Sequence, residues 1–272
     1  MIGTSTHDTK RGEDCRAFIS AITDEPALWA GAVTDWQKLL QPIGCAEIHP
    51  HDLYLLFQLL VGGWPLVGDP GKLGERLKGA MEKSLREGRE RSDWGVINSA
   101  YEETVKRLVD ALLVNQPFLE SFHRTRSTLQ DIGRRKSLIQ AALKLTIPGV
   151  PDIYRGAEDW EQSFMDPDNR RPVDFAELSR RLAERDADAD AKLALTQTLL
   201  SLRRNEPLLF AEGSYESIDS GPTTLAFRRR LDGRHLVVMA DLSQGHRAGL
   251  SPVAGYRTIV GDRTTPVWVG LS

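Results

Sequence analysis

Ionisable side chains of several kinds are concentrated near the start of the sequence. His7 and Asp8 are adjacent, and Lys10 and Arg11 follow them after a single threonine. The β-branched and hydroxyl-bearing residues that precede this cluster predict a strand over residues 2–6. Chain ends usually fray, so we expect the neighbours of this strand to come from elsewhere. The cluster is a candidate site, although Asp8 alone could be a strand-end cap and His7 a satisfied core residue.

A second dense stretch, rich in aspartate and arginine, lies in the middle of the chain. The pattern over residues 144–150 predicts a short buried strand that runs into a proline- and glycine-rich loop. That loop passes through Tyr154 and leads to a polar run that includes Asp168, Asn169 and Arg170. Barrels of the α/β class place their working residues in such loops, at the carboxyl ends of buried strands. The sequence therefore predicts a second part of the candidate site here.

The composition is that of a globular protein and argues against several classes of partner. Of the 272 residues, 40% are hydrophobic and 27% are charged, and the formal net charge is -3. This balance gives no support for nucleic acid or an anionic membrane surface as a partner. No apolar run approaches the roughly 20 residues of a membrane span, and the start lacks a signal-peptide pattern. Cys15 and Cys45 have no metal-ligand spacing and suit a reducing cytosol, so we expect a cytoplasmic protein without bound metal.

Helical patterns fill the chain from about residue 12 to residue 145. His49 and the residues after it have the composition of a cap before a nearly all-apolar helix. Asp69 precedes a proline that suits the first position of the next helix. Ser99 and Glu102 have the spacing of a capping box. We therefore expect a large block of helices between the two parts of the candidate site.

After Pro207 the pattern changes to short strands separated by turn residues. Asp232 and Gly233 lie between two of these strands and are a strong signal for a two-residue hairpin. The pattern predicts a small antiparallel sheet module over residues 207–272, which packs against the rest and carries no chemistry. Its strands are expected at 215–218, 224–228, 235–240, 257–260 and 267–269.

Three motifs, in their order along the chain, resemble those of the maltooligosyl trehalose synthases, a family of α-amylase-type glycoside hydrolases. A bare His-Asp pair would be weak support, but three motifs in the right order are specific. The resemblance runs in register through almost the whole chain and departs from the family at Arg155, where relatives tend to have glutamine. The motifs are Thr6-His7-Asp8-Thr9-Lys10-Arg11-Gly12-Glu13-Asp14, Pro148-Gly149-Val150-Pro151-Asp152-Ile153-Tyr154 and Asp166-Pro167-Asp168-Asn169-Arg170-Arg171-Pro172-Val173-Asp174-Phe175.

The resemblance implies an α/β fold with a small all-β tail. Residues 1–206 would be the C-terminal part of a (β/α)8 TIM barrel, and 207–272 a small antiparallel, β-sandwich-like domain. Residues 2–6 would form the seventh barrel strand and 144–150 the eighth, with a helical insertion at about 15–135. The six earlier strands would then lie outside this sequence, in a longer protein or in a separate partner chain.

The family rearranges a glycosidic bond with retained configuration. Such chemistry takes a carboxylate nucleophile and a protonated carboxyl group about 5 Å apart. A third carboxylate that binds sugar hydroxyls can stabilise the positive charge of the transition state. The resemblance implies that third role for Asp8 and makes His7 a neutral donor to hydroxyls. It also implies substrate contacts for Lys10, Arg11, Tyr154, Asp168, Asn169 and Arg170.

Several of these residues also have purely structural interpretations. Arg11 could pair with Glu13 or Asp14 as local scaffolding. Arg170 and Arg171 could brace their loop by pairing with Asp166 or Asp174. Tyr154 could fill the core instead of stacking on a sugar ring.

The resemblance leads to three functional hypotheses, none of which requires a cofactor. The first is part of an intramolecular transglucosylase, (1→4)-α-D-glucan 1-α-D-glucosylmutase, which converts the reducing-end α-1,4 bond of a maltooligosaccharide to the α,α-1,1 bond of trehalose. The second is part of a related α-glucan hydrolase, in which water attacks the glycosyl-enzyme. The third is a non-catalytic glucan-binding module. In the first two, we expect the chain alone to be catalytically incomplete, because the nucleophile and the acid belong to earlier strands.

Overall fold

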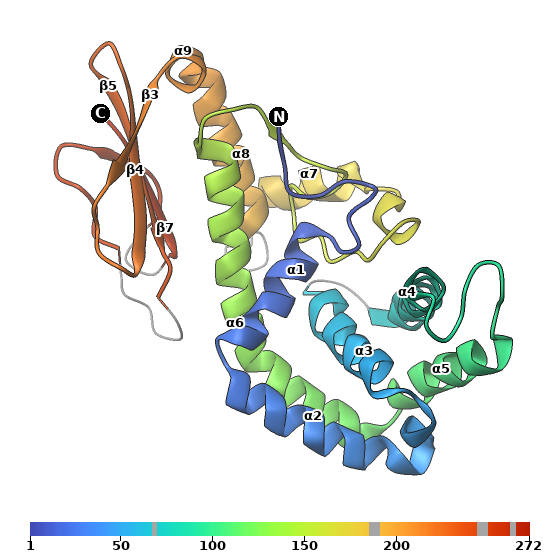
Figure 1. Cartoon of the computed structure of the whole chain (residues 1–272). Helices are drawn as coiled ribbons and strands as arrows, with labels where there is room; N and C mark the ends of the chain where they lie inside the picture. The colour runs from blue at the N-terminus through green and yellow to red at the C-terminus, as the bar shows by residue number, and fades with distance from the viewer. Residues whose placement is uncertain (67–69, 185–190, 244–249, 262–264) are drawn as a thin grey trace. The chain divides into compact units, whose positions relative to one another are not determined.

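The computed structural model describes the whole chain apart from residues 67–69, 185–190, 244–249 and 262–264 (Figure 1). The chain divides into two compact units. The helical unit comprises His7–Gly133 and Gln162–Arg171, and the mixed unit comprises Met1–Thr6, Arg134–Glu161 and Pro172–Ser272. The boundary expected at residue 207 stays a prediction.

The helical unit confirms the predicted block of helices. Short 3-10 turns connect several of the helices and include η4 (Pro70–Lys72) and η5 (Asp168–Arg170). The helix α6 (Gln116–Thr146) contributes residues to both units. The other helices of this unit are α1 (Glu13–Ser20), α2 (Pro26–Leu40), α3 (Pro50–Gly63), α4 (Leu73–Gly88) and α5 (Ser99–Leu112).

Aromatic rings fill the centre of the helical unit. Trp36 is completely buried, and its ring meets those of Trp29, Phe57 and Phe118 edge-on, with centroids 5.2 to 5.6 Å apart. The indole nitrogen of Trp36 donates to the Ser121 hydroxyl at 3.1 Å, so burial leaves no polar atom of this side chain unsatisfied. Packing of this kind holds helices together more strongly than helix propensity does.

Two adjacent glycines allow the last turn of α3 to approach its neighbours closely. A Cβ atom on Gly62 would lie 2.6 Å from the Cys15 sulfur, and one on Gly63 would lie 2.1 Å from the Phe164 ring. Neither distance is compatible with van der Waals radii. Glycine is therefore required at both positions by packing.

The caps of these helices agree with the sequence in part. His49 caps α3, since its Nδ1 accepts from the backbone N–H of His51 at 3.3 Å. The prediction of a capping box at Ser99 was wrong. Asn98 caps α5 instead, because its side-chain oxygen accepts from the Tyr101 N–H at 3.2 Å. The expected cap at Asp69 lies outside the described residues, and α4 begins at Leu73, after η4.

The mixed unit contains two short parallel strands. β1 (Ile2–Gly3) pairs in parallel with β2 (Pro151–Asp152), with Ile2 opposite Pro151. The predicted strand over 144–150 was wrong, because α6 continues to Thr146, whose hydroxyl donates to the Ala142 carbonyl at 2.6 Å. The strand expected over 2–6 pairs only at its first two residues.

A five-stranded antiparallel sheet completes this unit and confirms all five predicted strands. Its order is β3-β4-β5-β7-β6. Asp232 and Gly233 have φ of 46° and 80° and form the two-residue turn between β4 and β5, as predicted. The strands are β3 (Ser214–Ile218), β4 (Thr224–Leu231), β5 (Arg234–Asp241), β6 (Arg257–Val260) and β7 (Val267–Leu271).

The core of the mixed unit joins helices to one face of that sheet. Leu145 of α6 and Leu199 of α8 (Ala191–Asn205) are buried in one cluster with Phe227 and Val238 of the sheet. The helices α7 (Phe175–Glu184) and α9 (Pro207–Ala211) also belong to this unit. Among the described helices of the whole chain, none is both long and apolar enough to cross a membrane.

The connection between α6 and β2 is held by an arginine of α8. Arg203 donates to the Leu145 carbonyl at 3.1 Å and to the Gly149 carbonyl at 2.8 Å. Gly149 has φ of 119°, and a Cβ atom there would lie 2.7 Å from the Ile2 side chain. Only glycine suits this position, where β1 packs against the turn that leads to β2.

A buried carboxylate links α4 to α5 in the helical unit. Glu102 accepts from Arg86 at 2.8 and 2.7 Å and from the Ser92 hydroxyl at 2.6 Å. The hydrogen bonds from Arg86 are the main reason that the pKa of Glu102 lies below its ordinary value of 4.5. The ionised carboxylate therefore stabilises the folded state above that value.

We predict that this contribution to stability disappears at acidic pH. Because the pKa of Glu102 is lower in the folded than in the unfolded chain, the free energy of unfolding should fall as pH drops below 4.5. Glu102→Gln should have a lower free energy of unfolding than the unmodified chain at pH 7. This difference should shrink in urea titrations at progressively lower pH. Glu103→Gln, on the exposed neighbour, should change stability by less than about 0.5 kcal/mol. A difference in the free energy of unfolding that is independent of pH would contradict a stabilising role for the ionised Glu102 carboxylate.

Candidate functional site

The His-Asp pair is exposed. The Nε2 atom of His7 lies 3.2 Å from the Oδ2 atom of Asp8, and the two side chains are 51% and 85% exposed. Neither residue is buried, which excludes the interpretation of His7 as a satisfied core residue. A carboxylate and an imidazole that face solvent together can accept from and donate to the hydroxyl groups of a ligand.

Lys10 and Arg11 differ in what they contact. The Nζ atom of Lys10 lies 2.5 Å from the Oε2 atom of Glu87 on α4. The backbone of Arg11 pairs with Phe164 as an isolated antiparallel bridge, and its carbonyl accepts from Arg16 at 2.5 Å. Within the described part of the chain, no ion pair with Glu13 or any other acid is found for Arg11, which leaves the scaffold interpretation without support.

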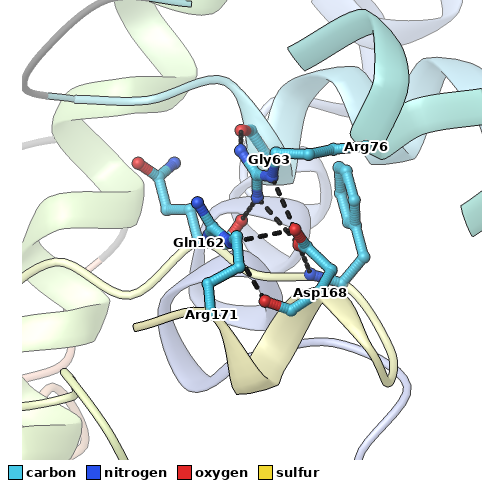
Figure 2. A network of polar contacts seen from close by, with 6 residues as sticks. Gly63, Arg76, Gln162, Asp168 and Arg171 are labelled. Carbon is cyan, nitrogen blue, oxygen red and sulfur yellow. Dashed lines mark hydrogen bonds and ion pairs between the residues drawn. The ribbon is translucent and has the colours of Figure 1, made fainter. Parts of the chain in front are cut away.

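Asp168 is structural in this arrangement. Its carboxylate accepts from Arg76 of α4 at 2.9 and 3.1 Å and from the backbone N–H of Phe164 at 2.7 Å. Arg171 lies 2.9 Å from the same carboxylate. Figure 2 shows these side chains converging on Asp168, whose own side chain is only 11% exposed. A carboxylate so fully engaged has little capacity left for a sugar hydroxyl.

The guanidinium of Arg76 also contacts groups of the protein other than Asp168. Its terminal nitrogens donate to the Gln162 carbonyl at 2.6 Å and, at the limit of hydrogen-bond distance, to the Gly63 carbonyl at 3.5 Å (Figure 2). Its guanidinium carbon lies 5.0 Å from the centroid of the Phe164 ring. This one side chain therefore links α4, the end of α3 and the loop over 162–171.

The amide of Gln162 fastens the same loop to the end of α3. Its Nε2 atom donates to the carbonyls of Gly62 and Trp64 at 3.0 and 2.9 Å. Its Oε1 atom accepts from the Leu66 N–H at 2.9 Å. The exposed carbonyls at a helix end are usually satisfied by following residues or water, and here a distant side chain satisfies them.

Asn169 connects this loop to the His-Asp segment. Its Nδ2 atom donates to the His7 carbonyl at 3.0 Å, and the residue is 6% exposed. Asn169 therefore positions the backbone of His7 and is too deeply buried to serve mainly as a ligand contact. Arg170 lies 3.0 Å from Asp166 and is 48% exposed, so the predicted bracing of the loop by this pair is present.

Tyr154 belongs to the mixed unit and follows β2 along the chain. Its carbonyl accepts from the Ala157 N–H at 2.9 Å, and its ring is partly buried. The helical unit thus brings together His7, Asp8 and the loop that holds Asp168 and Asn169. The sugar contact expected of Tyr154 stays a prediction.

Sequence reasoning missed Arg76 and Gln162, which position the site. Arg76 is 92 residues away from Asp168 along the chain. An arginine within an amphipathic helix normally indicates a solvated face, and a single sequence offers no signal that links it to one distant aspartate. Among the described residues, no group of three or more His, Cys, Asp or Glu side chains could hold a metal ion.

Comparisons with known proteins agree over most of the chain. No family model matches. A Mycobacterium tuberculosis (strain H37Rv) protein with the provisional name maltooligosyl trehalose synthase is 36% identical over 234 residues, which are 84% of this chain and 29% of that protein. The structure of a Sulfolobus tokodaii protein, provisionally named in the same way, is 32% identical with a TM-score of 0.85 and covers 99% of this chain. Maltooligosyltrehalose synthase from Arthrobacter ramosus is 30% identical with a TM-score of 0.77 and covers 100% of this chain.

These relatives are much longer than the chain that they match. The 272 residues span 29% of the curated relative and 38% of each of the two solved chains. The similarity thus concerns one portion of each relative.

Replacing Arg76 by methionine should free the loop over 162–171. The change leaves the buried carboxylate of Asp168 with less compensation, and we expect the free energy of unfolding to fall by about 3 kcal/mol in urea titrations. Hydrogen exchange of the Phe164 amide, which donates to Asp168, should become faster.

Lys38→Met is the matched control, because Lys38 forms an exposed ion pair with Asp35 at 3.5 Å in the same unit. Its effect should stay below about 1 kcal/mol. Equal losses from Arg76→Met and Lys38→Met would refute a special role for Arg76.

Proposed function

Because this chain corresponds over most of its length to the C-terminal portion of maltooligosyl trehalose synthases, we propose that it forms part of such an enzyme. The proposed reaction is an intramolecular transglucosylation. It converts the reducing-end α-1,4 bond of a maltooligosaccharide to an α,α-1,1 bond. The hydrolase and the non-catalytic binding module have no separate observation in their favour.

The exposed His7-Asp8 pair carries this proposal. The Asp8 carboxylate is 85% exposed and can accept from the hydroxyls of a sugar, and these hydrogen bonds strengthen as the ring acquires oxocarbenium character. His7 lies 3.2 Å from it and, when neutral, can donate to an adjacent hydroxyl or accept from one. Asn169 holds the His7 backbone, so the pair is presented by a braced segment and not by a free chain end.

The rest of the reaction requires groups that these 272 residues are not proposed to supply. Retention of configuration needs a carboxylate that attacks the anomeric carbon and a carboxylic acid that protonates the leaving oxygen. The glucose released from the bond then attacks the glycosyl-enzyme through its anomeric hydroxyl, and the same carboxyl group removes its proton. We assign Asp8 to neither role.

The proposed architecture places β1 and β2 as the seventh and eighth strands of a (β/α)8 barrel. Their parallel pairing supports this assignment. Residues 207–272 would form the domain that follows the barrel. The remaining barrel strands would come from a longer protein or from a separate partner chain, and the substrate would be an α-glucan.

The first test is activity. The isolated 272-residue chain should produce no non-reducing product from maltopentaose, because one carboxylate of the expected three cannot complete the reaction. A chimaera in which this chain replaces the matching portion of the Mycobacterium relative should be active. Product made by the isolated chain would mean that it contains its own nucleophile. Release of glucose without transfer by the chimaera would favour a hydrolase.

In that chimaera, Asp8→Asn should lower kcat roughly 100- to 1,000-fold, as loss of one group that stabilises transition-state charge does. Asp35→Asn is the control, since Asp35 is 65% exposed and lies in the same unit. An unchanged kcat in Asp8→Asn would contradict the role of this carboxylate.

A further inference from the structure

An open hollow lies between the helix α8 and the edge strand β6, both of which belong to the mixed unit. Its volume is about 370 Å³. Arg257 and Ile259 line it from β6. Thr258, between them, is directed elsewhere, since its hydroxyl accepts from the Trp268 indole at 3.1 Å. The lining residues on α8 are Gln197, Thr198, Ser201, Leu202 and Asn205.

Arg257 supplies the only charge in this lining. Among the described residues, its guanidinium has neither an ion pair nor a side-chain hydrogen bond, and the residue is exposed. Other arginines of the same sheet have carboxylate partners, as Arg228 does in Glu216 at 2.5 Å. Arg257 therefore presents its planar set of N–H donors to the hollow, in a geometry that matches the oxygens of a phosphate or a carboxylate.

Two hydroxyl groups on α8 also face the hollow without a use inside the helix. A serine or threonine within a helix often donates to the carbonyl four residues earlier, as Thr104 of α5 does to Ala100 at 2.9 Å. In the part of the chain that the structure describes, neither Thr198 nor Ser201 makes such a hydrogen bond. Their hydroxyls can therefore donate to a ligand or accept from one.

The other groups in the lining are neutral and limit where an anion can lie. The Asn205 carboxamide can donate and accept, and Leu202 and Ile259 provide an apolar wall. Asn205 is the last residue of α8, and the partial negative charge of a helix C-terminus disfavours anions. The lining thus offers one place for an anionic group, at Arg257, and neutral hydrogen-bonding places along α8.

We propose that this hollow binds a small hydroxylated oxyanion, a sugar phosphate or a sugar carboxylate. Arg257 binds the anionic group, and the polar side chains of α8 bind the hydroxyls. A lining with one cation and no aromatic ring does not suit a polyphosphate or a nucleobase. The volume lies within the range of small-molecule sites. This site goes beyond the proposed function and does not depend on it, because none of its residues belongs to the candidate site described above.

The test is isothermal titration of the full 272-residue chain with glucose 6-phosphate, gluconate, glucose and inorganic phosphate in turn. The two hydroxylated anions should bind more tightly than glucose, which lacks the charge, and more tightly than phosphate, which lacks the hydroxylated chain. Arg257→Met keeps the aliphatic stem and removes the donors, so it should weaken their binding about tenfold, the loss expected for a hydrogen bond to a charged group. Ser201→Ala should weaken it severalfold.

Arg204→Met is the matched control, because it removes an exposed cation from the last turn of α8 that does not line the hollow. It should bind like the unmodified chain. Equal weakening by Arg204→Met and Arg257→Met would indicate unspecific attraction of anions and overturn the site. Tighter binding of glucose 6-phosphate than of gluconate would assign a phosphate to Arg257, and the reverse would assign a carboxylate.

Three further outcomes would overturn the inference. They are no binding of either hydroxylated anion, binding of glucose as tight as that of both anions, and binding of inorganic phosphate as tight as that of glucose 6-phosphate. Circular dichroism establishes that each variant is folded. If Arg257→Met is unfolded, Ser201→Ala and the conservative Arg257→Lys decide, with Arg257→Lys expected to bind less tightly than the unmodified chain because it lacks the planar pair of donors.

Discussion

The ion pair between Arg76 and Asp168 is the contact on which the arrangement of the candidate site depends. Both side chains are nearly buried, at 13% and 11% exposed, so each charge requires the other. The pair gains little over an apolar replacement of both partners, but loss of one partner leaves a desolvated charge. The ion pair fixes the position of the loop over 162–171 relative to α4. Asn169, in the same loop, then positions the backbone of His7 through a hydrogen bond to its carbonyl.

Similar pairs recur elsewhere in the helical unit. Arg91 binds both carboxylate oxygens of Asp52 at 2.5 and 2.8 Å, and the Tyr101 hydroxyl donates to the same carboxylate at 2.6 Å. Burial, followed by this hydrogen bond to Asp52, raises the pKa of Tyr101 to about 12. Arginine suits such positions because its planar, permanently charged group meets a carboxylate with two parallel hydrogen bonds. The aromatic core supplies cohesion, and the arginine pairs set the register of loops against helices.

The structure could be predicted from the sequence where it is determined by residues close together in the chain. The turn at Asp232 and the five strands around it follow from alternation and turn chemistry, which act over a few residues. The strand predicted over 144–150 failed because a buried apolar run fits a helix as well as a strand, and here packing of Leu145 against the sheet core kept α6 helical. In the site, His7 and Asp8 were recognisable from their motif. The burial of Asp168 and Asn169 was not, since it depends on Arg76 and on backbone groups far away in the chain.

The pairing of β1 with β2 has a consequence for the order of folding. Ile2 finds Pro151 only after the whole intervening chain has been closed into a loop, at an entropic cost of about 4 kcal/mol for a flexible chain of that length. A ladder of two residues cannot offset such a cost. The hairpin of β4 and β5 closes through two residues and can form in microseconds, before any distant contact. The pairing of β1 with β2 is therefore expected to form late in folding, and the Lys144–Thr4 hydrogen bond at 2.9 Å and the packing of Ile2 on Gly149 hold β1 in place once it has formed.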